Sequence, residues 1–150
     1  MKIAIGSDHA GFHLKETLRD WLTSNGYEVT DSGTYSDGRS DYPVYGEAVA
    51  DHVANGRVDF GVLVCGSGQG ICMAANKVHG VRAGVIRTVE DAQMTRAHND
   101  ANVACFGERV TEPDVAIAAL KEFLEAPFEG GRHADRVALM SKIEKGERLY

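Results

Sequence analysis

The chain has 150 residues, of which 43% are hydrophobic and 25% are charged, and its formal net charge is -6. This composition is typical of an ordinary globular protein, and the length predicts a single domain spanning residues 1–150. The negative charge argues against general nucleic-acid binding, which depends on a basic surface. We find no signal-peptide pattern and no apolar run that could cross a bilayer, so we expect no membrane association.

Short apolar runs alternate along the chain with segments whose apolar residues recur at helical spacing. The short runs predict five strands, at residues 2–6, 27–30, 60–64, 81–86 and 103–106. The helical spacing predicts helices around residues 14–22, 42–54, 71–78, 89–97, 113–123 and 132–145. This order predicts an α/β fold with a five-stranded parallel sheet. Helices on both faces would make it a three-layer αβα sandwich, with an additional C-terminal helix.

Polar segments follow the first three predicted strands. Asp8 and His9 come after the first strand, residues 32–42 after the second, and residues 65–70 after the third. In open parallel sheets, ligands bind beyond the carboxyl ends of the strands. We therefore expect these three segments to meet at one edge of the sheet and to form the functional site there.

The third of these segments is the loop Cys65-Gly66-Ser67-Gly68-Gln69-Gly70. Three glycines in five positions let the backbone approach a ligand closely, and free N–H groups at a strand-to-helix turn favour negative charge. The same features favour the thiolate form of Cys65. We interpret this loop as the reactive centre. The alternative is that Cys65 is a small buried hydrophobic residue, as most free cysteines are.

Other glycine-loop chemistries fit this segment less well. Its glycines are not spaced as in a dinucleotide-binding fingerprint, and it lacks the Gly-Lys-Ser or Gly-Lys-Thr of a P-loop. A nucleophile elbow would need glycine where Cys65 stands. A cysteine phosphatase is a more serious rival, but it needs an arginine six residues after the cysteine, and that residue is Ile71.

Cysteine and histidine spacing gives little support for a disulfide or a metal site. The three cysteines, Cys65, Cys72 and Cys105, are an odd number without a C-x-x-C pair. We therefore expect no disulfide framework and no structural zinc, and a reducing cytoplasm as the location. His9 and His13 could share a helix face, but no third ligand accompanies them, so a metal site there is only weakly indicated.

Two further polar clusters lie outside the glycine loop. His98 and Asn99 fall between a predicted helix and the fifth strand, where they could reach the ligand edge or simply end the helix. Arg132 and Arg136 are four residues apart and share a helical face. Two guanidinium groups so placed suit a phosphate dianion, although a solvated charged surface is an equal alternative.

Together these stretches resemble the type B ribose-5-phosphate isomerases and their relatives, the galactose-6-phosphate isomerases. The matching residues are 6–11, 41–43, 65–68, 70, 74–77, 80–83, 98–103, 107–109, 130–133 and 136–137. They extend over essentially the whole chain. No single motif is decisive, but their order and joint presence are specific.

The resemblance implies a flavodoxin-like or Rossmann-like domain that works as a homodimer or a dimer of dimers. It implies an active site at the dimer interface to which both subunits contribute, and neither a metal nor an organic cofactor. Family members use as catalytic base either a cysteine at the strand end or a glutamate just after the glycine loop. Cys65 and Ile71 match the cysteine type.

The resemblance also implies a reaction and a set of residue roles. The reaction would be the interconversion of ribose 5-phosphate and ribulose 5-phosphate through a cis-enediolate, with Cys65 as the base. His98 would open the sugar ring, with Asp8 and Ser67 near the sugar. The remaining substrate contacts would come from His9, Tyr42, Gly66, Gly68, Gly70, Asn99, Arg109, Arg132 and Arg136.

Alternative functions stay open at this point. A hexose 6-phosphate, such as allose 6-phosphate or galactose 6-phosphate, or another aldose could be the substrate. A cysteine phosphatase or a non-catalytic sugar-phosphate binding subunit is a more distant alternative.

Overall fold

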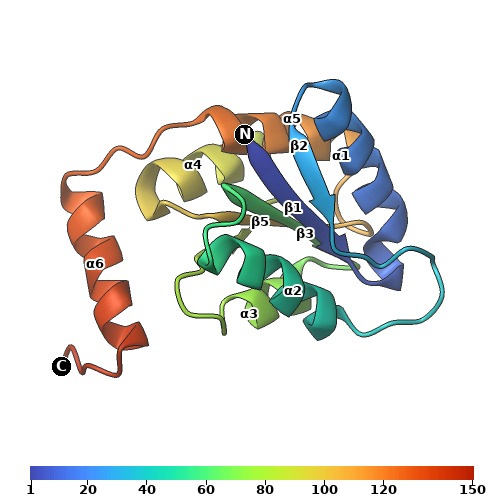
Figure 1. Cartoon of the computed structure of the whole chain (residues 1–150). Coiled ribbons are helices and arrows are strands. Elements are labelled where there is room, and N and C mark those ends of the chain that lie inside the picture. Colours follow the sequence, from blue (N-terminus) through green and yellow to red (C-terminus); the bar gives the residue numbers. More distant parts are fainter.

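Five parallel strands form the centre of the computed structural model, which describes residues 1–150 (Figure 1). The strands are β1 (Lys2–Ser7), β2 (Glu28–Asp31), β3 (Phe60–Cys65), β4 (Ala83–Val85) and β5 (Val103–Gly107). Their order across the sheet is β2-β1-β3-β5-β4, and every neighbouring pair is parallel. The predicted five-stranded parallel sheet is confirmed. Its order differs from the flavodoxin order 2-1-3-4-5 in the last two strands.

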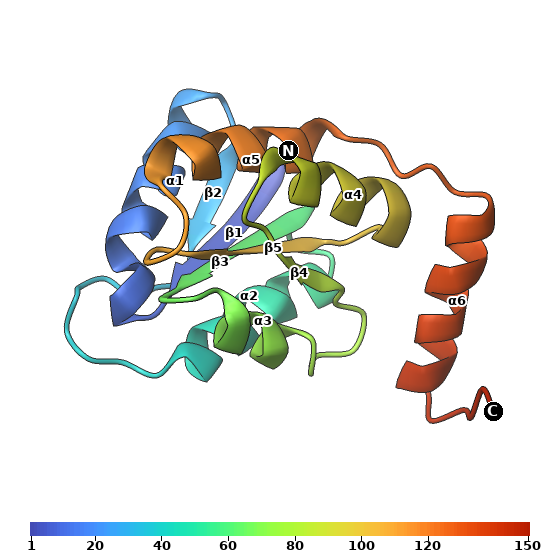
Figure 2. The ribbon, with the colours of Figure 1, turned by 180° about the vertical axis from the view of Figure 1, so that it is seen from behind.

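Helices cover both faces of this sheet. Five of them are α1 (Phe12–Ser24), α2 (Tyr42–Ala54), α3 (Gln69–Ala75), α4 (Val89–Asn99) and α5 (Pro113–Glu125). One face carries α1, α4 and α5, and the other carries α2 and α3 (Figures 1 and 2). The predicted three-layer αβα sandwich is confirmed.

Successive residues of the strands enter opposite cores, as the alternation of side chains along a strand requires. In β1, Ile3 and Ile5 pack under α1 and α5, whereas Ala4 packs under α2. In β3, Cys65 belongs to the core beneath α2 and α3. Because both faces of the sheet are covered, the central strands are apolar along almost their whole length.

Local signals fix most helix ends. Thr88 accepts a hydrogen bond from the backbone N–H of Asp91 at 3.0 Å and so caps α4. Pro43 and Pro113 stand in the first turns of α2 and α5, where proline needs no N–H partner. Gly26 follows α1 with a φ of 85°, which is typical of a glycine that ends a helix.

Two predicted elements are shorter in the structure. β4 comprises three residues instead of 81–86, because the N–H of Arg82 is bound by the side chain of Asn102 at 2.7 Å. α3 ends at Ala75 rather than at residue 78, because the Asn76 side chain bonds both backbone groups of Ala83. The side chains of Asn76 and Asn102 thus hold the edge strand β4 in place through hydrogen bonds to its backbone and to Arg82. The spacing of apolar residues in the sequence does not predict these hydrogen bonds.

The last helix, α6 (Arg132–Glu144), stands away from the sandwich at the end of an extended connection (Figures 1 and 2). Its predicted position at residues 132–145 is confirmed. It carries exposed apolar side chains, among them Leu139, Met140 and Ile143. A cavity of about 670 Å³ separates it from the β4 edge of the sheet. None of the helices is both long and apolar enough to span a membrane.

Candidate active site

A cavity of about 470 Å³ opens beyond the carboxyl ends of β1, β3 and β5. The polar side chains that line it are those of Asp8, His9, Tyr42, Cys65, Ser67 and Arg109. The chain leaves β1 toward the face covered by α1, and leaves β3 toward the face covered by α3. Such a divergence opens a crevice between neighbouring strands, where open α/β sheets bind their ligands. The predicted meeting of these segments at one sheet edge is confirmed.

Cys65 is the last residue of β3, and its sulfur borders this cavity. The side chain is only 5% exposed, so little bulk water reaches it. The backbone N–H of Gly68 donates a hydrogen bond to Sγ at 3.1 Å. The sulfur is therefore held in place by the backbone of the glycine loop. Cys65 therefore lies at the boundary between this cavity, which it lines, and the core beneath α2 and α3.

The glycines of the loop allow two polar side chains to lie directly against it. A Cβ atom on Gly66 would come within 2.9 Å of Nη1 of Arg109, and one on Gly70 within 2.7 Å of the Tyr42 ring. Arg109 is also fixed through its backbone N–H, which donates to the carbonyl of Gly66 at 3.0 Å. The loop thus holds a guanidinium and a phenol at the same cavity as the thiol.

His9 is held by the loop that follows β2. Nδ1 of its ring lies 3.0 Å from the carbonyl oxygen and 3.2 Å from the backbone nitrogen of Ser40. The backbone N–H of His9 donates a hydrogen bond to the Ser40 hydroxyl. These contacts occupy Nδ1, so Nε2 is the nitrogen left for a ligand. Asp8 is buried, and one of its carboxylate oxygens accepts the N–H of Gly11 at 3.1 Å.

The structure does not join His9 and His13 in a metal site. Nδ1 of His9 is engaged by Ser40, whereas Nε2 of His13 faces Asp37 at 3.6 Å on an exposed surface. The weakly indicated metal site at these two histidines is therefore not formed.

The other predicted site residues lie elsewhere in the chain. His98 and Asn99 form the end of α4, which precedes β5, and the following Asn102 accepts the N–H of Gly61 at the start of β3. They therefore lie near the amino ends of the strands, and the length of β5, about 13 Å, separates them from the cavity edge. Of the two alternatives that the sequence left open for this cluster, the structure favours the end of a helix, because α4 returns the chain to the opposite edge of the sheet.

Arg132 and Arg136 lie on α6 and do not line the cavity of Cys65. The helix stands next to the end of α4, so the two arginines belong to the same region as His98 (Figure 1). The predicted site residues therefore fall into two groups within one chain. One group surrounds Cys65, and the other surrounds His98.

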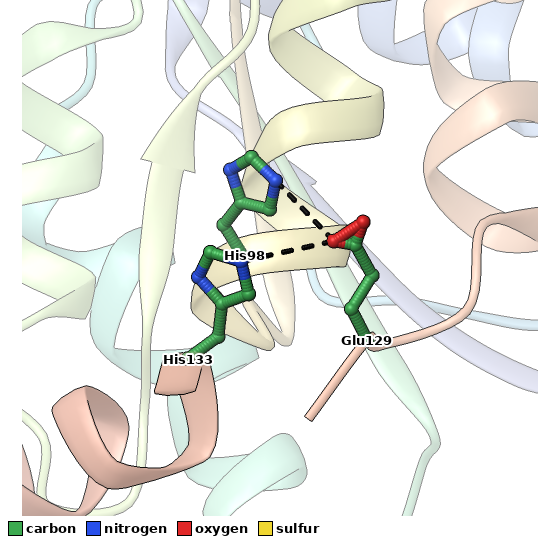
Figure 3. A group of neighbouring side chains, drawn as sticks. All are labelled: His98, Glu129 and His133. Carbon is green, nitrogen blue, oxygen red and sulfur yellow. Dashed lines mark ion pairs between the residues drawn. The ribbon is translucent and has the colours of Figure 1, made fainter. Parts of the chain in front are cut away.

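His98 stacks on a second histidine that the sequence patterns did not single out. The rings of His98 and His133 are 4.2 Å apart between centroids and parallel within 9°. Their Nε2 atoms lie 3.4 and 3.7 Å from the same oxygen of Glu129 (Figure 3). Burial lowers the pKa of His133 below its ordinary value. The positive charges of His98, Arg132 and Arg136 lower that pKa further, against the opposing effect of Glu129.

Only a weak signal in the sequence could have revealed this cluster. Glu129 and His133 are four residues apart, but Glu129 precedes α6 and lies in irregular chain, so helical spacing does not apply to it. The turn after His98 is fixed by Asp100, which takes a left-handed φ of 47° and binds Arg82 and Arg96.

Cys72 and Cys105 are buried in the core, away from the cavity. Burial raises the pKa of the Cys105 thiol well above its ordinary value. A hydrogen bond from Cys105 lowers the pKa of Cys72, and burial opposes that shift. Cys65 is the one cysteine that borders the polar cavity.

Comparison with known proteins agrees with this arrangement. The family described as Ribose/Galactose Isomerase matches residues 3–140. The chain belongs to this family. Ribose-5-phosphate isomerase B of Escherichia coli (strain K12) is 48% identical over 144 residues, which cover 96% of this chain and 97% of that protein.

Solved structures of other ribose/galactose isomerases share the fold. Ribose-5-phosphate isomerase B of Clostridium thermocellum has a TM-score of 0.96 and 49% identity, covering 97% of this chain and 99% of that one. The enzyme of Mycoplasma genitalium, solved with bound ribulose-5-phosphate, has a TM-score of 0.92 and 40% identity, covering 97% of each chain. The chain is therefore a sugar-phosphate isomerase of the ribose-5-phosphate isomerase type.

Proposed function

We propose that this isomerase interconverts ribose 5-phosphate and ribulose 5-phosphate through a cis-enediolate, with Cys65 as the base. The observation that carries the proposal is the position of Cys65 at the wall of a cavity that Asp8, His9 and Arg109 also line, with the N–H of Gly68 donating a hydrogen bond to its sulfur. Relatives of this chain that carry the name ribose-5-phosphate isomerase B support ribose 5-phosphate as the substrate.

The thiolate of Cys65 removes the proton from C2 of the open-chain sugar and returns it to C1. The thiolate is the form of a cysteine that can accept a proton, and the N–H of Gly68 fixes the position of this sulfur. The N–H of Gly68 is used by the sulfur, so the backbone N–H groups of Gly66 and Gly70 are the ones that face the enediolate oxygen as it becomes negative. A well-placed donor of this kind contributes roughly 3–4 kcal/mol to transition-state stabilisation.

Other residues of the same cavity hold the substrate. Asp8 and Ser67 act at the sugar hydroxyls and the ring oxygen, and Tyr42 supports the sugar chain. His9, whose Nε2 is free, and Arg109 bind the phosphate. Because the phosphate is remote from C1 and C2, its binding energy orients the reacting carbons at Cys65.

The second group of residues reaches the cavity from another copy of the chain. His98 opens the sugar ring, Asn99 contacts the sugar, and Arg132 and Arg136 complete the phosphate site of the neighbouring subunit. A homodimer with twofold symmetry would build two such shared sites, and a dimer of dimers would build four. The exposed apolar residues of α6 support this assembly, because a second subunit would bury them.

The remaining rivals are less well supported. Position 71, where a cysteine phosphatase needs an arginine, is a fully buried Ile71 in the core. A non-catalytic binding subunit would have no need for a cysteine at the wall of the cavity. The three free thiols support a reducing, cytoplasmic location.

Replacement of the thiol tests the proposed base. Cys65→Ala should lower kcat for ribose 5-phosphate by a factor of at least about 10² and leave the affinity for substrate nearly unchanged. Cys72→Ala is the matched control, because Cys72 is equally buried but does not border the cavity. Turnover retained in Cys65→Ala would remove the proposed base.

The wild-type protein should be assayed in the same experiment on a panel of ribose 5-phosphate, allose 6-phosphate, galactose 6-phosphate and unphosphorylated ribose. We expect the highest kcat/KM with ribose 5-phosphate. A preference for either hexose phosphate would move the assignment to the alternative substrate, and release of inorganic phosphate would indicate a phosphatase.

A further inference from the structure

Three side chains meet between the end of α4 and the start of α6, apart from the cavity of Cys65 (Figure 3). His98 belongs to α4, His133 to α6 and Glu129 to the connection between α5 and α6. One ligand atom of each side chain lies within 4.8 Å of the other two. Two imidazoles and a carboxylate at one point are a ligand set that Zn²⁺ prefers.

The spacing of these atoms suits metal ligands better than hydrogen-bond partners. Nε2 of His98 and Nε2 of His133 lie 3.4 and 3.7 Å from Oε2 of Glu129. An N–H···O hydrogen bond requires about 2.7–3.2 Å between the heavy atoms. In a tetrahedral zinc site with bonds of about 2.0–2.1 Å, neighbouring ligand atoms lie about 3.3–3.4 Å apart.

His133 provides a second, independent observation. It is 7% exposed, and its Nε2, which points toward Glu129, has no hydrogen-bond partner (Figure 3). A buried polar atom without a partner is costly, and a bound cation would take up its lone pair. Because the two rings are parallel, one must turn to aim both nitrogens at a single ion. His98, with a side chain 31% exposed, has room to do so.

We infer that His98, Glu129 and His133 form a binding site for a divalent transition-metal ion such as Zn²⁺. The three protein ligands leave a fourth position open to water, as in other sites built from two histidines and a glutamate. The ion is an inhibitor and not a cofactor. This consequence rests on the proposed function, in which His98 opens the sugar ring, because a nitrogen bound to a metal cannot exchange a proton.

Calorimetric titration of Zn²⁺ into the wild-type protein tests the site, with the absorption spectrum of bound Co²⁺ as a second readout of tetrahedral coordination. Glu129→Gln and His133→Asn should each weaken Zn²⁺ binding by about tenfold or more, because each removes a ligand. Glu129 is half exposed, so the glutamine variant should fold even if replacement of the buried His133 impairs folding.

Two control variants keep the test specific. His13→Gln removes one partner of the exposed pair His13–Asp37. The N···O distance in this pair is similar to those in the cluster, but the pair offers only two ligands and is open to solvent. Cys72→Ala removes a thiol that is buried away from both the cavity of Cys65 and the cluster. Both should bind Zn²⁺ as tightly as the wild type. An affinity that is unchanged in the Glu129 and His133 variants, or that is lost in Cys72→Ala, would overturn the site.

The isomerase assay separates the metal site from the proposed function. Zn²⁺ should inhibit the wild type, and inhibition of Glu129→Gln should require a concentration about tenfold higher. Stoichiometric Zn²⁺ at this cluster with undiminished turnover would overturn the inhibitory role and the assignment of ring opening to His98. It would leave both the metal site and the Cys65 base in place.

Discussion

At the scale of single residues, Gly68 shows why the reactive loop is built from glycines. Its φ is 80°, a conformation that side chains rarely adopt, and its N–H is the donor to the sulfur of Cys65. A Cβ atom there would lie 3.0 Å from the carbonyl carbon of Phe106, in the neighbouring strand. Backbone conformation and close packing therefore both require glycine at this position.

We expect Gly68→Ala to lower the free energy of unfolding by about 3 kcal/mol, from left-handed strain and overpacking together. Gly26→Ala is the matched control, because Gly26 has a similar φ of 85° but a Cβ atom there would meet no other atom within 4 Å. The control should cost about 1–2 kcal/mol, and urea unfolding measures both. Equal losses would show that packing against Phe106 contributes nothing.

The sequence predicts the residues of the reactive loop but not the location of every partner. Cys65 and Ser67 could be assigned because strand, glycines and helix follow each other directly in the chain. Arg109 and His98 could not be placed in this way. His98 precedes β5 in the chain, and Arg109 follows it. The position of β5 in the sheet is decided by packing between distant segments, and the local spacing of apolar residues does not predict that packing.

At the scale of elements, a buried lysine joins α1 to the end of β2. Lys15 is fully buried, and its Nζ lies 2.9 Å from both carboxylate oxygens of Asp31 and 2.7 Å from the carbonyl oxygen of Thr34. These contacts anchor the beginning of the loop whose other end, at Ser40, holds His9. Helix, strand and active-site loop are therefore linked through one ammonium group.

We expect Lys15→Met to lower the free energy of unfolding by about 3 kcal/mol, because it leaves the carboxylate of Asp31 partly buried without its main partner. Chemical denaturation measures this loss. Lys121→Met on the exposed side of α5 is the control and should change stability by less than about 0.5 kcal/mol. A loss no larger than that of the control would mean that the ammonium group does not hold the loop.

Strand order is the feature of the elements that the apolar pattern left undetermined. The alternation of strands and helices predicts a parallel sheet, but it does not say that β5 lies between β3 and β4. This order places the residues that follow β5 beside the glycine loop, where the N–H of Glu108 donates to the carbonyl of Cys65 at 2.9 Å. If β4 stood next to β3 instead, Arg109 would lie one strand farther from the cavity.

At the scale of the whole molecule, the two groups of site residues lie at opposite edges of the sheet. Cys65 and His9 occupy the carboxyl edge, while His98 and Arg132 lie near the amino edge and on α6. On the proposed function, a single chain presents two incomplete half-sites. On the proposed function, catalysis requires two copies that place their opposite edges together.

Complementation between two inactive variants tests this sharing. Cys65→Ala and His98→Asn should each have little activity alone. In a coexpressed mixture, each mixed dimer contains one site in which both residues are intact. We expect about a quarter of the wild-type turnover, which a steady-state assay of the purified mixture measures. If no activity returned, Cys65 and His98 would not be supplied by different subunits.

If the chain works as the proposed dimer, the outer strands of the sheet have a further consequence for a separated subunit. β4 has three residues, and β2 has four, with an acidic residue at each end. Both edge strands are short, and β2 is also charged, so they expose few unpaired backbone groups, whereas aggregation through strand pairing needs long, flat, apolar edge strands. Subunits separated by dilution or mild heating should therefore stay dispersed long enough to find each other again.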